Sequence, residues 1–328
     1  MSPLLLFVLF LILWAEFVNG WTDAPNAIAT VVSTRVLSPR KAIVLATSLN
    51  TLGAFSGIAV ATTIGKGIVK PEMINLQTLA GAMTGIIIWS TFAWKKGLPT
   101  SESHGLIAGL TGSALAAGGF ETLESSGWNK VFIGLLFSTF LGYFSAYFLF
   151  VSIVWVFKNT PISRVRRLFG KLQIISAAFM AYSHGSNDGQ KFIGTFALAL
   201  LLGGVTTEFS VPAWVIILCA LTMGVGTSVG GWRIIKTLGV KLAKLEPQHG
   251  FAAETAAAAS IELATRFGIP LSTTHTISTA IMGVGSAQRL NKVRWSVASN
   301  IITGWVLTFP ICGLIAWVTT KVLLALGI

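Results

Sequence analysis

The chain has 328 residues, of which 53% are hydrophobic and only 10% are charged, and its mean hydropathy is +0.77. A soluble domain carries about 25% charged residues, so this composition excludes an ordinary soluble protein and indicates a polytopic protein of the lipid bilayer. The net charge of +12 comes from short basic clusters between apolar segments, which favours membrane-flanking loops over a nucleic-acid surface.

Ten apolar segments predict an all-α membrane fold, because a transmembrane helix needs roughly 20 such residues. In chain order they cover about 3–34, 42–64, 74–94, 98–118, 131–157, 172–203, 211–231, 250–267, 268–287 and 296–326. The first and sixth are too long for one simple helix, and each contains an aspartate, so we expect broken helices. The fourth and ninth are rich in Gly, Ser and Thr, which predicts re-entrant hairpins or broken helices. Residues 1–20 lack the features of a cleaved signal peptide, so we expect a retained helix.

The basic residues predict the topology. If all ten segments cross, 17 Lys and Arg fall on one side of the membrane and 5 on the other. The positive-inside rule makes the richer side cytoplasmic, so both termini of this multi-pass cell-membrane protein face outward. Residues 1–157 and 172–328 then form two halves of five crossings each, joined by a basic cytoplasmic linker at 158–171. Because five is odd, the second half is an inverted repeat of the first.

One short pattern occurs twice, inside the first and sixth segments. Residues 19–30 read NGWTDAPNAIAT and residues 184–195 read HGSNDGQKFIGT, with Asp, Ile and Thr at equal spacing. Asp23 and Asp188 are the only aspartates in the chain. A carboxylate at membrane depth costs free energy unless it is solvated, paired or ion-bound, and such acids mark ion or substrate pathways. We therefore favour a functional role for the two aspartates over a purely structural one as helix caps. A repeated intramembrane acid indicates a secondary transporter whose halves build one site.

A second pattern is also duplicated. Residues 97–104 read GLPTSESH and residues 268–275 read GIPLSTTH. Proline followed by Ser or Thr is typical of a helix start, whose free N–H groups and partial positive charge suit an oxyanion. Two such starts that face each other predict a donor-rich cage. Each of these hydroxyls could instead have a structural role, bonding to a carbonyl of its own helix. For His104 and His275 the alternative to ligand binding is a packing role.

With both duplicated motifs, the chain resembles the inorganic phosphate transporter (PiT) family of cation–phosphate symporters, and its bacterial low-affinity branch, over about residues 10–325. The resemblance implies phosphate between the two hydroxyl-rich hairpins, a coupling cation beside the aspartates, and a homodimer. It implies no enzyme activity and no resident cofactor. The phosphate site would comprise Thr100, Ser101, Ser103, Ser272, Thr273, Thr274 and Lys191. The site for the coupling cation, sodium or a proton, would comprise Asp23, Asn26, Asn187, Asp188 and Glu102.

Two departures from the sodium-coupled pattern affect the coupling ion. Thr22 stands where such members carry Asn before the first aspartate, and Lys191 replaces the Asn that follows the second. A fixed ammonium near Asp188 would occupy a sodium position or pair with phosphate, unless Lys191 extends to the membrane interface instead. Glu102 adds an acid that can be protonated when desolvated. These features favour protons over sodium, and a neutral metal–phosphate complex is an alternative substrate.

Other functions remain open on the sequence. A sulfate permease of the same family would use a similar cage, although acceptor side chains favour the protonated anion phosphate. A passive anion channel would show uptake that is insensitive to ion gradients. An intramembrane hydrolase would use Ser101 or Ser272 with His104 or His275, but the duplicated arrangement and the lack of a Gly-x-Ser-x-Gly elbow argue against it. Cys219 and Cys312 are isolated, and the sequence gives no certain metal site.

Overall fold

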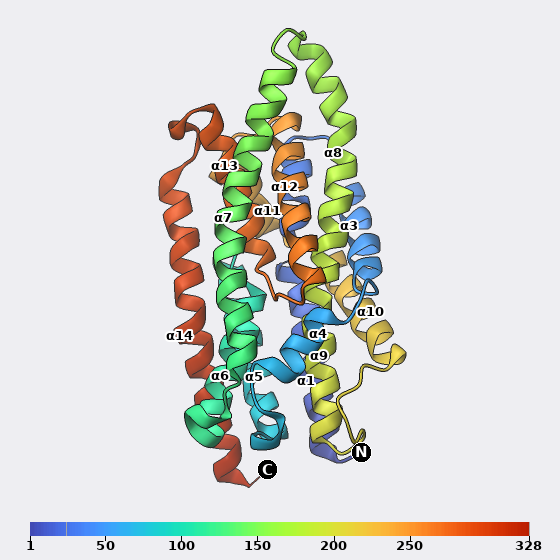
Figure 1. Ribbon diagram of the computed structural model, residues 1–328, viewed down its shortest axis with the longest axis vertical. Helices are drawn as coiled ribbons and strands as arrows, with labels where there is room; N and C mark the ends of the chain where they lie inside the picture. Colours follow the sequence, from blue (N-terminus) through green and yellow to red (C-terminus); the bar gives the residue numbers. More distant parts are fainter. Residues whose placement is uncertain (24, 328) are drawn as a thin grey trace.

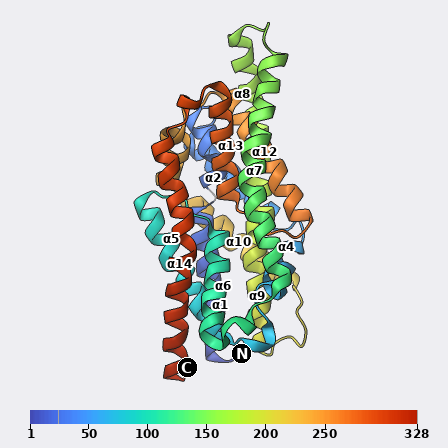
Figure 2. The ribbon, with the colours of Figure 1, turned by 60° about the vertical axis from the view of Figure 1, so that its left-hand side comes forward.

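The computed structural model describes residues 1–23 and 25–327, and over these residues the chain is helical without β-strands (Figure 1). Both termini lie at the lower end of the molecule in Figures 1 and 2, and the α7–α8 connection lies at the upper end. The α-helices are α1 (Pro3–Thr22), α2 (Pro25–Ser33), α3 (Pro39–Gly53), α4 (Ala59–Gly67), α5 (Leu76–Lys96), α6 (Glu102–Gly118), α7 (Ser125–Val156), α8 (Ile162–His184), α9 (Gln190–Leu202), α10 (Ala213–Val229), α11 (Trp232–Lys236), α12 (Pro247–Arg266), α13 (Thr273–Gln288) and α14 (Trp295–Leu326). Two wider π-helical stretches, η3 (Gly185–Gly189) and η4 (Thr237–Leu242), continue α8 and α11.

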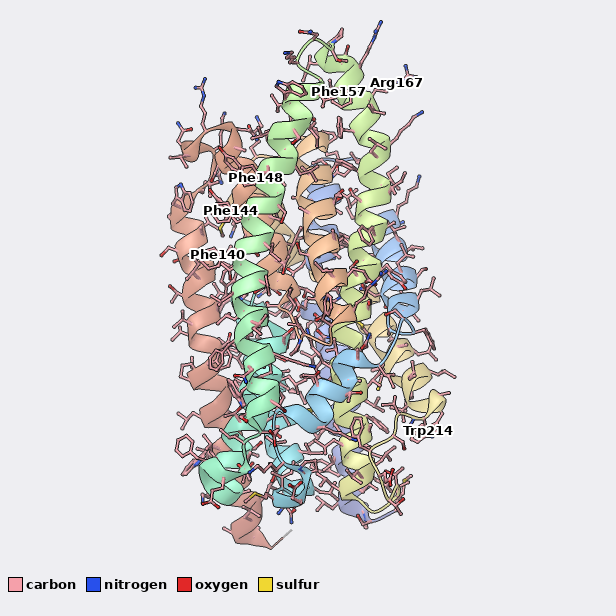
Figure 3. All side chains as sticks on the ribbon, viewed as in Figure 1. Phe140, Phe144, Phe148, Phe157, Arg167 and Trp214 are labelled. Atoms are coloured by element: carbon pink, nitrogen blue, oxygen red, sulfur yellow. The ribbon has the colours of Figure 1, made fainter. Side chains whose placement is uncertain are left out.

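Several helices are long and apolar enough to cross a membrane. By length and composition these are the α1–α2 stretch Pro3–Ser33, α5, α7 and α14. A fifth is counted if α10 and Trp232–Leu242, bent by 60°, form one span. Phe140, Phe144 and Phe148 lie on the outer face of α7 and are 57%, 48% and 62% exposed (Figure 3). Exposed aromatic rings along a long helix suit contact with lipid chains rather than water.

The two aspartate motifs interrupt their helices in different ways. α1 ends at Thr22 and α2 begins at Pro25, and the junction between them includes residue 24, which lies outside the described residues, so the break expected there stays a prediction. In the second copy the chain stays helical, and residues Gly185–Gly189 form a π-helical turn. The expected break is therefore a local widening of the helix, a feature that is frequent at functional sites.

The hydroxyl-rich motifs form the tips of two helical hairpins. In the first, α5 ends at Gly97, which has a φ of 69°, and α6 begins after an extended stretch. Residues Val69 and Leu123, which flank this hairpin, pair with each other, so both of its ends lie at the lower end of the molecule. Ala243 and Val293 likewise pair beside the α12–α13 hairpin at the upper end. The two tips therefore approach from opposite ends and meet.

One expected segment was wrong. Segment 42–64 is not one helix but α3 and α4, separated at residues 54–58, where Ser56 Oγ donates to Ser186 Oγ at 2.7 Å. Segment 211–231 agrees with α10, after which the chain bends by 60°. Most of the expected linker 158–171 belongs to α8, because its Arg, Lys and Leu residues are good helix formers that extend the helix outside the apolar region.

Glycines allow α3 to touch the π-helical turn backbone to backbone. A Cβ at Gly185 would collide with the main chain of Asn50, and one at Gly53 would collide with the carbonyl of Tyr182. The α3 helix and the turn that carries Asp188 are therefore in direct main-chain contact.

Candidate functional site

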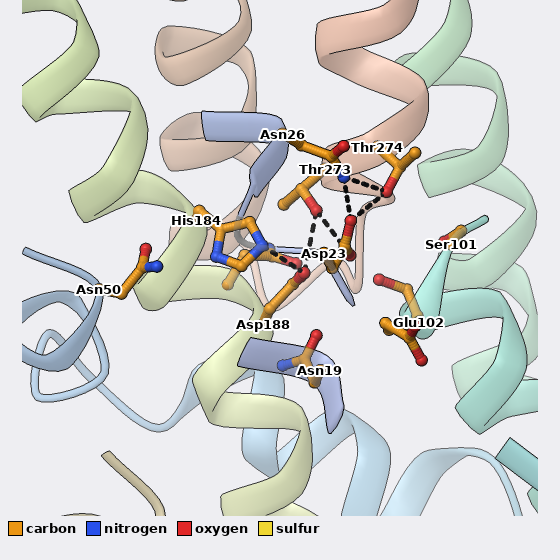
Figure 4. A network of polar contacts seen from close by, with 12 residues as sticks. Asn19, Asp23, Asn26, Asn50, Ser101, Glu102, His184, Asp188, Thr273 and Thr274 are labelled. Carbon is orange, nitrogen blue, oxygen red and sulfur yellow. Dashed lines mark hydrogen bonds and ion pairs between the residues drawn. The ribbon is translucent and has the colours of Figure 1, made fainter. Parts of the chain in front are cut away.

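The two aspartates, 165 residues apart in sequence, lie close together in one buried site (Figure 4). Asp23 and Asp188 are each 1% exposed. The hydroxyl of Thr273, at the start of α13, lies 2.9 Å from Asp188 Oδ2 and 3.4 Å from Asp23 Oδ2. A hydroxyl has one proton, so Thr273 donates to one carboxylate at a time. The two motifs thus form a single carboxylate pair joined by one hydroxyl.

Asp23 is held by side chains from both halves of the chain. Thr274 Oγ1 and Asn26 Nδ2 both donate to Asp23 Oδ1. Asn26 Nδ2 also lies 2.8 Å from Thr274 Oγ1, and Thr274 Oγ1 lies 3.1 Å from the carbonyl oxygen of Thr100. Asn26 Oδ1 is buried and, within the part of the chain that the structure describes, has no hydrogen-bond partner. An amide oxygen beside a carboxylate is a suitable ligand for a hard cation.

Asp188 is paired with Lys191, which is itself 1% exposed. Lys191 Nζ donates to Asp188 Oδ1, to Ser103 Oγ and, at 2.9 Å, to the carbonyl oxygen of Leu271. Lys191 therefore does not extend to an interface. Its ammonium links the second aspartate motif to the tips of both hairpins.

The two hairpin tips form a matched pair of helix starts. Ser101 caps α6 by accepting from the backbone N–H of His104 at 3.2 Å, and Ser272 caps α13 by accepting from that of His275 at 3.2 Å. Ser272 Oγ also donates to Ser101 Oγ at 2.9 Å. Both helix starts, with their partial positive charge, thus meet at one point next to the Lys191 ammonium. This arrangement can bind a tetrahedral anion.

The imidazoles of His104 and His275 serve packing. Their ring centroids are 4.4 Å apart in an edge-on contact, and the His275 ring stacks on Trp305 at 3.8 Å. Ser272 accepts from the backbone of His275, and in the described part of the chain its hydroxyl has no bond to an imidazole. A general base must be within hydrogen-bond reach of its nucleophile, so the geometry gives the hydrolase alternative no support.

Two residues expected in the cation site make other contacts. Glu102 accepts from Thr22 Oγ1 at 2.7 Å and from Ser90 Oγ at 2.5 Å, and it lies to the side of Asp23 in Figure 4. Asn187 Nδ2 donates to Thr265 Oγ1 at 2.7 Å. Glu102 and Ser90 therefore form a small hydrogen-bond network with Thr22, the residue that stands in place of Asn before Asp23.

Several buried polar residues near the site were not predicted. His184 Nε2 lies 3.3 Å from Asp188 Oδ2, and its position at the start of the second motif was the available signal. Glu16 lies two helical turns before Asp23. Glu254, which lies in the Ala-rich α12, accepts from Thr30 and, at 3.1 Å, from Gln173 Nε2. A lone acid in an apolar helix is a signal that motif matching overlooks.

One group of ligand atoms is suited to a cation. Asp23, His184 and Asp188 each offer one ligand atom, and these atoms lie within 4.8 Å of one another. Carboxylate and imidazole together suit a divalent transition metal, whereas carboxylate and amide oxygens alone suit sodium. Lys191 neutralises Asp188 in the observed arrangement and would compete with either ion.

Comparison with known proteins gives consistent matches. A sequence model described as "Phosphate transporter family" matches residues 19–316. A Rhizobium meliloti protein named "Probable low-affinity inorganic phosphate transporter" is 43% identical, covering 96% of this chain and 95% of the relative. A Bacillus subtilis protein of the same name is 38% identical, covering 95% of each chain. A solved structure described as "The sodium-dependent phosphate transporter" aligns with a TM-score of 0.89 at 24% identity, covering 99% of this chain and 100% of the other.

Proposed function

The chain belongs to the phosphate transporter family, and we propose that it takes up inorganic phosphate across the cell membrane by proton-coupled symport with alternating access. The observation that supports this most directly is the meeting of two helix starts, Ser101 and Ser272, beside the buried Lys191 ammonium. Charge-assisted donors of this kind suit a phosphate anion. Transport requires no residue to catalyse bond cleavage, and the relatives are named as transporters.

Phosphate is proposed to bind between the hairpin tips. Its oxygens would replace the mutual bond of Ser101 and Ser272 and accept from Ser103, Thr273, Thr274 and Lys191, with Thr100 supporting the cage. Both hairpins contribute donors, so an anion bound there contacts both halves of the chain. Such a site can close from either side when one half moves against the other.

The two halves are proposed to be inverted repeats with both termini outside the cell. The support is the equal order of the duplicated motifs, the approach of the two hairpins from opposite ends, and the excess of basic residues on one side. The homodimer rests on the family resemblance alone. Measuring the mass of the detergent-purified particle would test it.

Protons are proposed as the coupling ion because Lys191 already neutralises Asp188. Sodium needs oxygen ligands, whereas an ammonium offers only donors and repels a cation. The sodium dependence in the name of the solved transporter belongs to that protein, which is only 24% identical to this chain. A neutral metal–phosphate complex is the alternative cargo, with the metal held by Asp23, His184 and Asp188.

Proteoliposomes test this proposal. Radiolabelled phosphate uptake is measured under an inward proton gradient, an inward sodium gradient, or neither, with and without excess sulfate and with and without Mg²⁺ or Zn²⁺. We expect uptake that follows the proton gradient and resists sulfate. The Ser101→Ala/Ser272→Ala double variant should raise the KM for phosphate. Equal uptake in all gradients would indicate a channel, strong competition by sulfate would indicate a sulfate permease, and either result would refute the proposal.

A further inference from the structure

We propose that Glu16 is a proton-carrying residue on the N-terminal side of the site, which binds a proton from the outer solution and passes it to the aspartate pair. The proposal rests on the proton-coupled function above and names a residue outside both duplicated motifs. In the transfer, the proton leaves one Glu16 carboxyl oxygen, passes through water molecules that bridge the distance of about 10 Å to the site, and neutralises one aspartate carboxylate. Glu16 is left as a carboxylate, so total charge is conserved.

The position of Glu16 suits such a relay. It lies on α1, is 0% exposed, and precedes Asp23 by seven residues. Two turns of an α-helix return to the same face, so Glu16, Asn19 and Asp23 form one polar line along α1. At 1.5 Å per residue, Glu16 lies about 10 Å from Asp23 toward the end that holds both termini. A proton on Glu16 is therefore partway between that end and the site.

The hydrogen bonds of Glu16 favour a carboxyl that gains and loses a proton. Asn19 Nδ2 donates to Glu16 Oε2 at 3.1 Å, whereas Glu16 Oε1 and Asn19 Oδ1 are both buried and have no hydrogen-bond partner among the described residues. A buried carboxylate oxygen without a donor leaves the ionised form poorly stabilised. A proton on Oε1 supplies the missing donor, and a carboxylic acid and an amide can then bond through both pairs of atoms.

The groups that face Glu16 connect it electrostatically to the site. α1 packs against α10, α5 and α9. The charged or titratable groups nearest to the Glu16 carboxyl are Asp188, Lys191 and Glu102, together with Cys219 of α10. The charged residues of α5, Lys95 and Lys96, lie in the last turn of that helix.

This arrangement links phosphate binding to the proton. The Lys191 ammonium favours ionised Glu16. A phosphate anion bound to Lys191 offsets that charge and thereby increases the proton affinity of Glu16.

The variant Glu16→Gln distinguishes a relay from a structural contact. Glutamine keeps the size of the side chain and an oxygen that accepts from Asn19, but its amide does not bind and release a proton as a carboxyl does. We expect uptake driven by a proton gradient to fall about tenfold or more, as for the loss of a proton-transfer group. Exchange of external for internal phosphate at equal pH, which requires no net proton movement, should be retained. Glu121→Gln, at an exposed acid after α6, is the matched control and should leave both assays unchanged.

A measurement on the unmodified protein does not depend on the folding of the variant. The hydrophobic reagent dicyclohexylcarbodiimide modifies protonated carboxyls within membranes, and mass spectrometry locates the adduct. We expect Glu16 to be labelled at acid pH and less as pH rises, with phosphate moving the midpoint to higher pH. Absence of Glu16 labelling at every pH, or an unchanged pH profile of uptake in Glu16→Gln beside an active wild type, would overturn the role of Glu16. A wild type that transports no phosphate in any gradient would instead refute the proposed function.

Discussion

The ammonium of Lys191 contacts the carboxylate of Asp188, one helical turn earlier, and both side chains are almost completely buried. The same ammonium contacts Ser103 on one hairpin and the carbonyl of Leu271 on the other. One charge thus joins the repeated aspartate to both tips of the proposed phosphate cage. Its removal affects the coupling ion and the anion together.

Replacing Lys191 by Asn should abolish proton-driven phosphate uptake or make it sodium-dependent. The amide offers an oxygen to sodium, while Asp188 loses its buried partner, a loss that costs about 3–5 kcal/mol when uncompensated. Uptake in proteoliposomes with separate proton and sodium gradients measures the outcome. Lys321→Asn, at an exposed position near the C-terminus, is the control for charge. Strong sodium stimulation of the wild type that persists unchanged in Lys191→Asn would contradict the assignment.

Asp23→Asn and Asp188→Asn should each nearly abolish coupled uptake while leaving membrane insertion intact. Asparagine fits the same space but does not carry the negative charge that neutralises a proton or cation. Asp188→Asn also leaves Lys191 without its counter-charge, so its thermal stability should fall more than that of Asp23→Asn. Uptake, surface labelling and a melting curve separate these effects. Normal uptake by either variant would make that aspartate structural.

Thr273 should be required for its hydroxyl rather than its shape. Thr273→Val keeps the branched side chain but removes the donor shared by the two carboxylates, leaving one unsatisfied at a cost of about 1–3 kcal/mol. We expect a clear loss of uptake in Thr273→Val and near-normal uptake in Thr273→Ser, measured at saturating phosphate. Equal activity of the two variants would show that the bridge is dispensable.

The ion pair at the upper end of the molecule should affect stability in a pH-dependent way. Arg166 Nη2 lies 2.6 Å from Glu246 Oε1, and this hydrogen bond lowers the pKa of Glu246 below its ordinary value. A lowered carboxyl pKa contributes stability that is present above the unfolded-state pKa and is lost as pH falls through the folded-state pKa. Arg166→Ala should therefore reduce the melting temperature slightly at neutral pH, and less in acid below the folded-state pKa of Glu246. The exposed arginine makes the effect small. A decrease in melting temperature that is larger in acid than at neutral pH would contradict this prediction.

The sequence predicted the parts of the site that are duplicated, because repetition marks residues such as Asp23, Asp188, Ser101 and Ser272 without any knowledge of contacts. Hydropathy likewise predicted the long helices. It did not predict that segment 42–64 divides into α3 and α4, since this break depends on contact with Ser186 in another part of the chain. The crossing number from loop charges stays a prediction, because α6 and α13 have only 17 and 16 residues.

Unduplicated residues were harder to assign. Glu16 and Glu254 have no acidic counterpart in the other half, so comparison of the repeats could not find them. The contact of Glu102 with Thr22 was equally hidden, because it joins residues 80 positions apart. Such contacts follow from how the hairpins pack, which local sequence patterns do not encode.

The main-chain contact of α3 with the π-helical turn has a mechanical consequence. Side chains between two helices can change rotamer and absorb a small displacement, but Gly53 and Gly185 leave none at this point. Any sliding of α3 along the turn must therefore shift the backbone of Ser186 and its neighbours, and with it the carboxylate of Asp188. A displacement of α3 is therefore transmitted directly to Asp188 and the proposed cation site, and a displacement of Asp188 is transmitted to the outer surface of α3.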